Sequence, residues 1–247
     1  MKAFKEMLKT ELKLSIRGMD MVIFAICMPL VILIILGMLY GDKPAFKGAE
    51  YTLLEQSFGA ISTIAICAGG VMGLPLLISD YRQKKILKRF RVTPISPVLI
   101  LIVHVVIYML YSVVSLILVA ITAKLLFHYQ MDGSILVFLG SYFLVMLSMF
   151  SIGMMVGGIA PNMKIASVIA SLLYFPMLIF SGATLPYEIM PKTLQNLVGV
   201  LPLTQGIKML KAATLGFSLT EVMFPIIIIC LLAVVCIGIS IKFFKWE

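Results

Sequence analysis

Residues 98–123 read VLILIVHVVIYMLYSVVSLILVAITA, and this stretch contains no Asp, Glu, Lys or Arg. A helix rises about 1.5 Å per residue, so about 20 apolar residues cross the roughly 30 Å of hydrocarbon in a bilayer. The apolar residues are continuous and do not alternate with polar ones, which favours a helix over a barrel strand. The stretch therefore predicts a membrane-spanning helix.

Five further stretches have the same character and also lack charged residues. The whole 247-residue chain is 62% hydrophobic and 13% charged, with a mean hydropathy of +1.12. Soluble domains are about half apolar and about a quarter charged. We therefore predict an all-α membrane protein in which residues 1–247 form one transmembrane domain. The six predicted spans are 21–40, 56–79, 98–123, 134–160, 165–182 and 222–241.

The distribution of basic residues predicts how the spans run. If the N-terminus is cytoplasmic, six crossings return the C-terminus to the same side, and most of the 20 Lys and Arg residues then lie in cytoplasmic segments. Positive residues accumulate on that side of membrane proteins, so we expect both termini in the cytoplasm. The net charge of +9 is explained by this topology and by anionic lipid, and it predicts no nucleic-acid binding.

Residues 1–20 form an amphipathic pattern with an apolar stripe at i, i+4 spacing and a basic opposite face. The stripe consists of Phe4, Leu8, Leu12 and Ile16, and the basic face of Lys9, Lys13 and Arg17. Such a helix lies in the membrane interface with its basic side toward lipid headgroups. The alternative is a binding site for a specific partner.

The predicted cytoplasmic segment 80–97 reads DYRQKKILKRFRVTPISP. Basic residues accompany Ile86, Leu87 and Phe90, and Pro94 and Pro97 would end a short helix there. The positive charges of this segment are enough to explain how the chain is oriented in the membrane, and the apolar residues are not needed for that. The apolar residues favour a helix that docks into a groove on a cytoplasmic partner, and both interpretations remain open.

The predicted outer segment 183–221 is too apolar for an ordinary loop, and prolines divide it into pieces too short to cross a bilayer. The prolines are Pro186, Pro191 and Pro202. We predict half-helices that enter the membrane and return, where they shield or gate a path from outside. The alternative is an amphipathic helix on the membrane surface.

Two spans carry glycines at small-xxx-small spacing, which lets helix backbones approach closely. These glycines are Gly69, Gly73, Gly153 and Gly157, and they predict helix packing or dimerisation. Prolines lie within four spans, where we expect kinks. They are Pro29, Pro75, Pro176 and Pro225.

Motifs for catalysis or cofactor binding are missing from the sequence. No G-x-x-x-x-G-K-[ST] phosphate loop, G-x-G-x-x-G or H-E-x-x-H occurs, and the four cysteines lie in apolar runs without metal-ligand spacing. We therefore predict no catalytic, cofactor-binding or metal-binding residues. His104, in the third predicted span, is expected to hydrogen-bond between helices.

The chain also lacks an evident energy source, because no carboxylate lies within the predicted spans where ion-coupled carriers keep one. If the protein pumps, a partner must supply the work. The alternative is a nucleotide-independent channel or membrane scaffold. For a channel, the polar residues Ser112, Ser115 and Thr122 form only a weak stripe along the third predicted span.

Together these features resemble the permease subunit of an ABC-2 type exporter. The family pattern between spans two and three is an acidic residue, Gly-Thr, and Leu-x-x-Leu-x-x-Thr-Pro. Asp80, Leu87, Phe90, Thr93 and Pro94 correspond to it, while Lys85-Ile86 replaces Gly-Thr. The outer signature is similar to Phe180-Ser181-Gly182 with Pro186 and Pro191, Leu201-Pro202-Leu203-Thr204, and Leu215-Gly216.

The resemblance implies a non-catalytic subunit of the cell membrane that pairs with a second permease copy or a sister permease. ATP and Mg would be bound by a separate ABC ATPase, and an amphipathic, drug-like or lipid-linked substrate would move outward. The implied ATPase-coupling residues are Asp80, Lys85, Ile86, Leu87, Arg89, Phe90, Thr93 and Pro94. The implied outer-gate residues are Ser181, Gly182, Pro186, Pro191 and Pro202.

Overall fold

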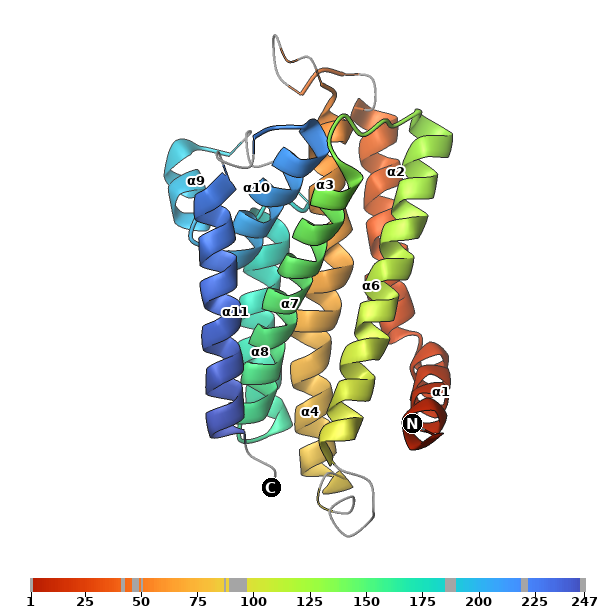
Figure 1. The fold of residues 1–247 in the computed structure, drawn as a ribbon, viewed down its shortest axis with the longest axis vertical. Coiled ribbons are helices and arrows are strands. Elements are labelled where there is room, and N and C mark those ends of the chain that lie inside the picture. The colour runs from red at the N-terminus through yellow and green to blue at the C-terminus, as the bar shows by residue number, and fades with distance from the viewer. Residues whose placement is uncertain are drawn as a thin grey trace.

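The computed structural model describes residues 2–40, 43–45, 49, 51–86, 88, 97–184, 190–218 and 222–244. These residues are almost entirely helical, and the helices form an elongated bundle (Figure 1). The elements are α1 (Lys2–Gly18), η1 (Val22–Cys27), α2 (Met28–Tyr40), α3 (Leu53–Cys67), η2 (Ala68–Gly73), α4 (Leu74–Gln83), α6 (Pro97–Phe127), α7 (Ile135–Ile159), α8 (Met163–Phe180), α9 (Lys192–Val198), α10 (Pro202–Leu215) and α11 (Met223–Phe243).

Six helices in the described part of the chain are long and apolar enough to cross a membrane, which confirms the six predicted spans. They are Val22–Tyr40, Leu53–Gln83, Val98–Phe127, Ile135–Ile159, Met163–Phe180 and Met223–Phe243. The second and third are longer than predicted. Their end turns include Glu55, Asp80, Arg82 and Lys124, because a helix can continue beyond the apolar stretch when polar residues reach the interface or a partner.

The two π-helical turns lie directly before prolines. In η1 the turn ends two residues before Pro29, and in η2 it ends two residues before Pro75. A proline within a helix lacks the N–H and its ring clashes with the carbonyl of the preceding turn. The wider turn accommodates that clash while the helix continues, so two of the four predicted kinks, at Pro29 and Pro75, coincide with a π-helical turn. Pro176 lies inside α8 and Pro225 in the first turn of α11, both without such a turn.

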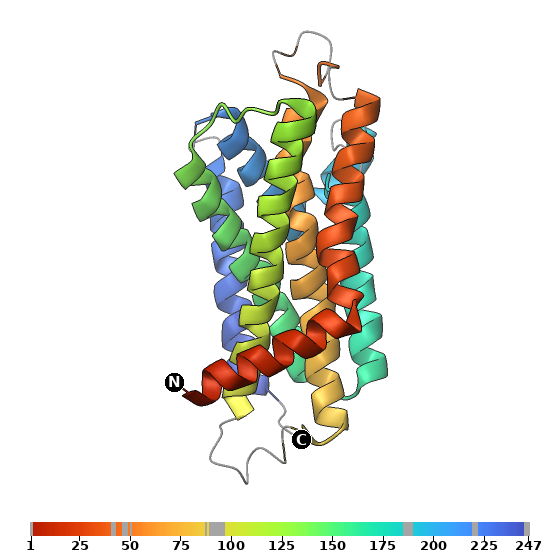
Figure 2. The same ribbon diagram turned by 90° about the vertical axis from the view of Figure 1, so that its right-hand side faces the viewer.

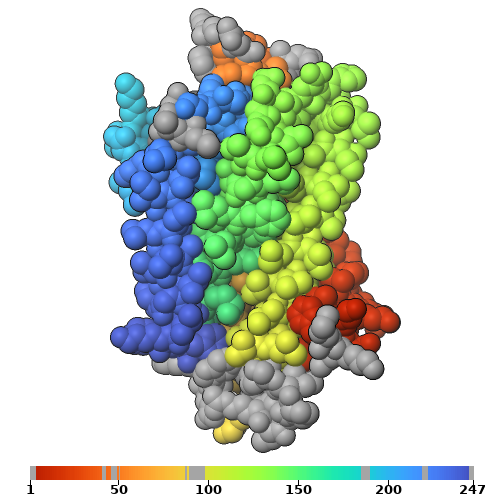
Figure 3. Space-filling model, in the orientation of Figure 1, coloured from red at the N-terminus to blue at the C-terminus, as the bar shows by residue number. Residues whose placement is uncertain are grey.

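The second span lies at the centre of the bundle. In its most apolar window 83% of the residues are buried, compared with 22% in the first span. Large apolar side chains cover the outer surfaces of the other helices, including Phe224, Leu231 and Val234 on α11 (blue in Figure 3). An apolar exterior around a packed interior is the arrangement expected in lipid, where the solvent is itself apolar.

Helix α1 crosses the end of the bundle at a steep angle to the spans (Figure 2). Phe4, Leu8 and Leu12 pack against the bundle core, and α1 contacts α6. Ile16, the fourth member of the stripe, is 49% exposed and does not pack against the core. Each i+4 step overshoots a full turn by about 40°, so the fourth member of the stripe has rotated away from the packing face.

The two ends of the bundle carry different elements. Helix α1 and the last residues of α4 and α11 lie at one end, while α9 lies at the other (Figure 1). An even number of spans places the start of the first span and the end of the last at the same end, as the topology predicts. The side of the membrane that each end faces stays a prediction.

Candidate functional site

The predicted coupling segment begins where α4 ends. Asp80 and Lys84 form an ion pair of 2.8 Å across the last turn, and Lys85 has a left-handed backbone with φ of 56°. That conformation turns the chain out of the helix, and Ile86 follows half-buried. Leu87, Arg89, Phe90, Thr93 and Pro94 lie outside the described residues.

Arg82 is buried at the end of α4 and binds the C-terminal end of α7. Its Nη1 donates to the carbonyl oxygen of Gly158 and its Nη2 to that of Gly157, each at 3.0 Å. Nη2 also donates to the carbonyl oxygen of Ala160. The last carbonyls of a helix have no partner within the helix and carry partial negative charge, so a guanidinium fits them well. Arg82 thus joins α4 to α7 just before the coupling segment.

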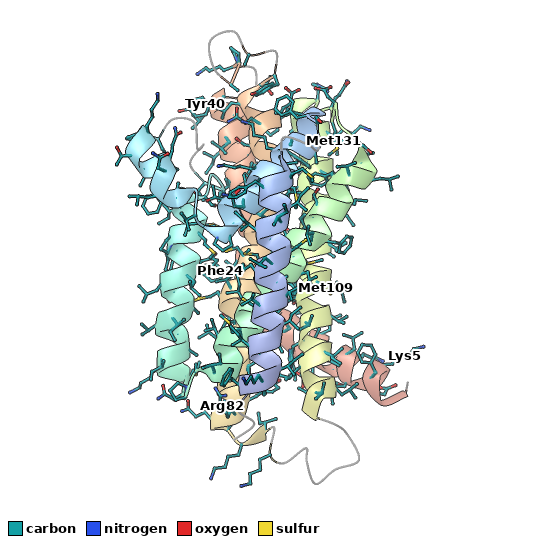
Figure 4. The ribbon with its side chains drawn as sticks, turned by 60° about the vertical axis from the view of Figure 1, so that its left-hand side comes forward. Lys5, Phe24, Tyr40, Arg82, Met109 and Met131 are labelled. Carbon is teal, nitrogen blue, oxygen red and sulfur yellow. The ribbon has the colours of Figure 1, made fainter. Side chains whose placement is uncertain are left out.

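In the sequence, Arg82 is only one of several basic residues that orient the chain. Its neighbours Lys84 and Lys85 are exposed, whereas Arg82 is 7% exposed. Figure 4 places it at the end of the bundle opposite Tyr40. One feature of the sequence indicates that Arg82 is buried. It lies where the helix of span two continues past the apolar stretch, one turn after the buried residues Ile78 and Ser79.

A second polar cluster joins α1 to the spans. The Tyr81 hydroxyl donates to Oε2 of Glu11 at 3.1 Å and lies 3.0 Å from Nε2 of His104. A phenol has one proton, so its oxygen accepts from Nε2–H while the proton goes to the carboxylate. His104 therefore hydrogen-bonds between α6 and α4, as expected, and Glu11 extends the chain of contacts to α1.

Replacing Tyr81 by Phe is expected to loosen α1 by removing both hydrogen bonds without changing the ring. We expect a loss of about 1–2 kcal/mol, because one of the bonds is to a carboxylate. Hydrogen exchange of the α1 backbone amides should become faster, while Tyr40→Phe, at the other end of the bundle, should leave it unchanged. Unaltered exchange in Tyr81→Phe would contradict the role of this cluster.

The glycines lie in close helix contacts within the chain. A Cβ on Gly153 would overlap the carbonyl oxygen of Gly70, and one on Gly157 would lie 3.0 Å from Ile78 and Pro75. Gly69 and Gly73 face Tyr108 on α6 at 3.3 and 3.1 Å. Three of these glycines therefore join η2 to its two neighbouring spans, and Gly157 joins α7 to α4. A use in dimerisation stays a prediction.

The outer segment has one exposed and one buried helix. Helix α9, which begins after Pro191, is mostly exposed, whereas α10, which begins at Pro202, is mostly buried. Gly206 of α10 lies against Val145, well inside α7, so α10 extends into the bundle. Both helices are too short to cross a bilayer, in agreement with the predicted division by prolines.

The first residues of the outer segment include a buried serine and a glycine with a left-handed backbone. Ser181 is buried and its hydroxyl has no hydrogen-bond partner among the described residues, and Gly182 has a φ of 99° that favours glycine. Thr184 donates to the carbonyl oxygen of Leu178 at 3.0 Å. Pro186 lies outside the described residues.

Side chains able to hold a metal do not gather within the described part of the chain, where no group of three His, Cys, Asp or Glu occurs.

Burial raises the pKa of Tyr129, just beyond α6, and Glu55 and Asp132 raise it further. The ring of Tyr129 stacks on Phe58 at 4.4 Å between centroids. This tyrosine is thus a neutral packing residue, and it offers no nucleophile near neutral pH.

Comparison with known proteins gives one family and two curated relatives. The sequence model of the ABC-2 type transporter family matches residues 2–215. The chain is 29% identical over 99 residues to Nodulation protein J of Neorhizobium galegae, covering 40% of this chain and 38% of that protein. It is 32% identical over 89 residues to Nodulation protein J of Rhizobium leguminosarum bv. viciae, covering 36% and 34%. The matched segments thus span little more than a third of these relatives.

Proposed function

Because this chain belongs to the ABC-2 type transporter family, we propose that it is the permease subunit of an ATP-driven exporter. The observation that carries the proposal is the family match over residues 2–215, which includes α1, the segment between spans two and three, and the α9–α10 pair. The chain is a multi-pass membrane protein, and permeases of this family normally work with an ABC ATPase.

In this proposal the ATPase docks on the segment 80–97, and the partner subunit binds ATP and Mg. The permease pairs with a second copy or a sister permease in the cell membrane. Movement of the docked segment is passed to α4, and the Arg82 hydrogen bonds to Gly157 and Gly158 connect α4 to α7. Rigid helices joined in this way shift as bodies.

The proposed cargo is an amphipathic, drug-like or lipid-linked molecule that moves outward. Support comes from the buried interior, which is mainly aliphatic and in which Arg82 is the one buried charged residue within the described part of the chain. Such an interior suits an apolar body better than a small ion. The outer gate would consist of the segment from Ser181 to Pro202. Helix α10, which begins at Pro202 where this segment ends, enters the bundle beside α3 and α7.

A channel through the polar stripe of α6 has little support. Ser112 and Ser115 are fully buried, and Ser112 donates to the backbone carbonyl of Tyr108 at 3.0 Å. The hydroxyl of Tyr142, on α7, donates to the backbone carbonyl of Ser112 at 2.8 Å. This part of the stripe is therefore packed against neighbouring backbone and side chains.

Co-purification tests the exporter proposal. The chain, extracted from its native cells in a mild detergent, is expected to bring down an ABC ATPase in equimolar amount, with measurable ATP hydrolysis. Phe90→Asp should release that ATPase, because a buried carboxylate in an apolar groove is strongly unfavourable. Arg89→Glu should weaken the complex by reversing one charge.

Lys9→Glu is the control for Arg89→Glu, because it makes the same charge change on the exposed face of α1. It should leave the complex intact. Retention of the ATPase by Phe90→Asp would contradict the docking role of segment 80–97. Absence of any ATPase in several detergents would favour a nucleotide-independent channel or scaffold, and ion flux through the purified chain would then be measured.

A further inference from the structure

A pocket of about 540 Å³ lies where α1 meets the spans. Its walls come from α1, from η1 and the residues before it, and from η2, α4 and α6. Ligand pockets for small molecules usually measure about 300–1,000 Å³. The pocket is therefore large enough for a drug-sized molecule or a lipid headgroup, and it lies at the end of the bundle that carries α1.

All the Asp, Glu, Lys and Arg side chains that line the pocket among the described residues are acidic. Glu11, Asp20 and Asp80 line it, and no Lys or Arg does so among the described residues. Lys84 compensates Asp80 from outside the lining at 2.8 Å, and Glu11 accepts from Tyr81. Asp20 is exposed. The charged side chains that line the pocket are thus all acidic, in a chain whose net charge is +9.

A tyrosine hydroxyl on the pocket wall has no hydrogen-bond partner among the described residues. Tyr108 lines the pocket and is 6% exposed, yet its hydroxyl makes no hydrogen bond within the described part of the chain. The hydroxyl end of the ring lies beside Gly73, where a Cβ would be 3.1 Å from Cζ, and Gly73 lines the same pocket. The Tyr108 oxygen is not among the buried polar atoms that lack a partner, so it is accessible from the pocket and can donate a hydrogen bond to a molecule bound there.

The remaining wall is apolar and adaptable. Met21, Phe24 and Met72 contribute thioether and aromatic surface, and the ring of Tyr108 adds a second aromatic face. Methionine fills irregular gaps, and aromatic faces attract organic cations. The combination of carboxylates with such surface suits a positive charge attached to an apolar body.

We propose that this pocket binds a lipophilic cation, with its charge beside Glu11 and Asp20 and its apolar body against Phe24, Met72 and the Tyr108 ring. Two sources share this chemistry: the ammonium headgroup of phosphatidylethanolamine in the membrane, and a cationic amphiphile that the protein exports. Binding by the chain itself needs no ATPase, whereas the second of these sources rests on the proposed export function.

The test measures binding of tetraphenylphosphonium to the purified full chain in dodecyl maltoside by equilibrium dialysis. Tetraphenylborate has the same shape and the opposite charge, and it should bind at least tenfold more weakly. Asp20→Asn and Glu11→Gln should each weaken phosphonium binding on the order of fivefold, because each removes one carboxylate partner. Tyr108→Phe should weaken binding of ethanolamine-type ammonium, which can hydrogen-bond to the hydroxyl, but not of tetraphenylphosphonium.

Glu6→Gln is the matched control, because it removes a carboxylate from the exposed face of α1 without touching the pocket. It should leave phosphonium binding unchanged, and the melting temperature of every variant is measured to verify folding. Equal binding of the phosphonium and the borate, or equal binding in Asp20→Asn, Glu11→Gln and Glu6→Gln, would overturn the proposal.

The two sources are separated by competition with short-chain lipids. If dihexanoyl phosphatidylethanolamine displaces tetraphenylphosphonium and dihexanoyl phosphatidylglycerol does not, the membrane supplies the ligand. If neither lipid competes while the carboxylate dependence holds, the pocket binds the free cationic amphiphile. Loss of carboxylate dependence contradicts the cation site but leaves the exporter proposal intact, because ATPase co-purification tests that separately.

Discussion

Replacing Gly153 by Ala is expected to destabilise the bundle by about 3 kcal/mol, because the added methyl group meets backbone, which cannot rotate away. The Cβ would overlap the carbonyl oxygen of Gly70 and lie 2.9 Å from its carbonyl carbon. Helix α7 would then have to move away from η2. That movement would also open the contact at Gly70, where an added Cβ would lie 3.0 Å from the carbonyl carbon of Met149.

Gly140→Ala is the control for this variant, because Gly140 lies on the same helix with nothing within 4 Å of its Cβ position. It should be neutral or slightly stabilising, since Ala is the better helix former. Unfolding is followed by circular dichroism in mixed dodecyl maltoside and sodium dodecyl sulfate micelles. Similar midpoints for Gly153→Ala and Gly140→Ala would refute the close crossing of α7 and η2.

Replacing Arg82 by Met is expected to have a comparably large effect, about 3 kcal/mol. Methionine preserves much of the apolar stem but removes the donors to Gly157, Gly158 and Ala160. Hydrogen bonds to a charged group contribute about 1.5–3 kcal/mol each, and buried carbonyls left unpaired carry a further cost. The expected loss is smaller than the sum of these contributions, because the carbonyls at the end of α7 can relax toward other donors.

Two further variants show whether the guanidinium itself matters. Arg82→Lys retains the charge but has one compact ammonium in place of a planar fork, so it should recover about half of the loss. Lys84→Met removes an exposed cation two residues away and should cost less than about 1 kcal/mol. If Arg82→Met unfolds at the same detergent composition as Lys84→Met, Arg82 does not hold α7 to α4.

Several features of the fold could be predicted from local sequence. The six spans follow from the length of the apolar stretches, because the bilayer fixes the length that a helix must bury. The divided outer segment follows from Pro191 and Pro202, since proline ends or begins helices. The amphipathic helix at the N-terminus also follows, although which members of its stripe pack against the bundle depends on the neighbouring helices.

The candidate sites were less predictable, because they join parts of the chain that are far apart. Glu11, Tyr81 and His104 come from three helices, and Arg82 meets carbonyls more than 70 positions along the chain. Nothing in the local sequence distinguishes Arg82 from Lys84, although one is buried and the other is exposed. Gly153 was predicted to allow a close approach, but its partner Gly70 was not predicted.

The apolar runs and prolines thus determined how many spans the chain has and roughly where they lie, since these depend on nearest neighbours and on the thickness of the membrane. Only the packed bundle decided that α10 enters the interior, that Arg82 caps α7, and that three carboxylates and Tyr108 surround one pocket. Burial and pairing of a side chain depend on which distant backbone and side-chain groups are brought to it. That arrangement arises from the packing of all the helices together, and no single segment contains it.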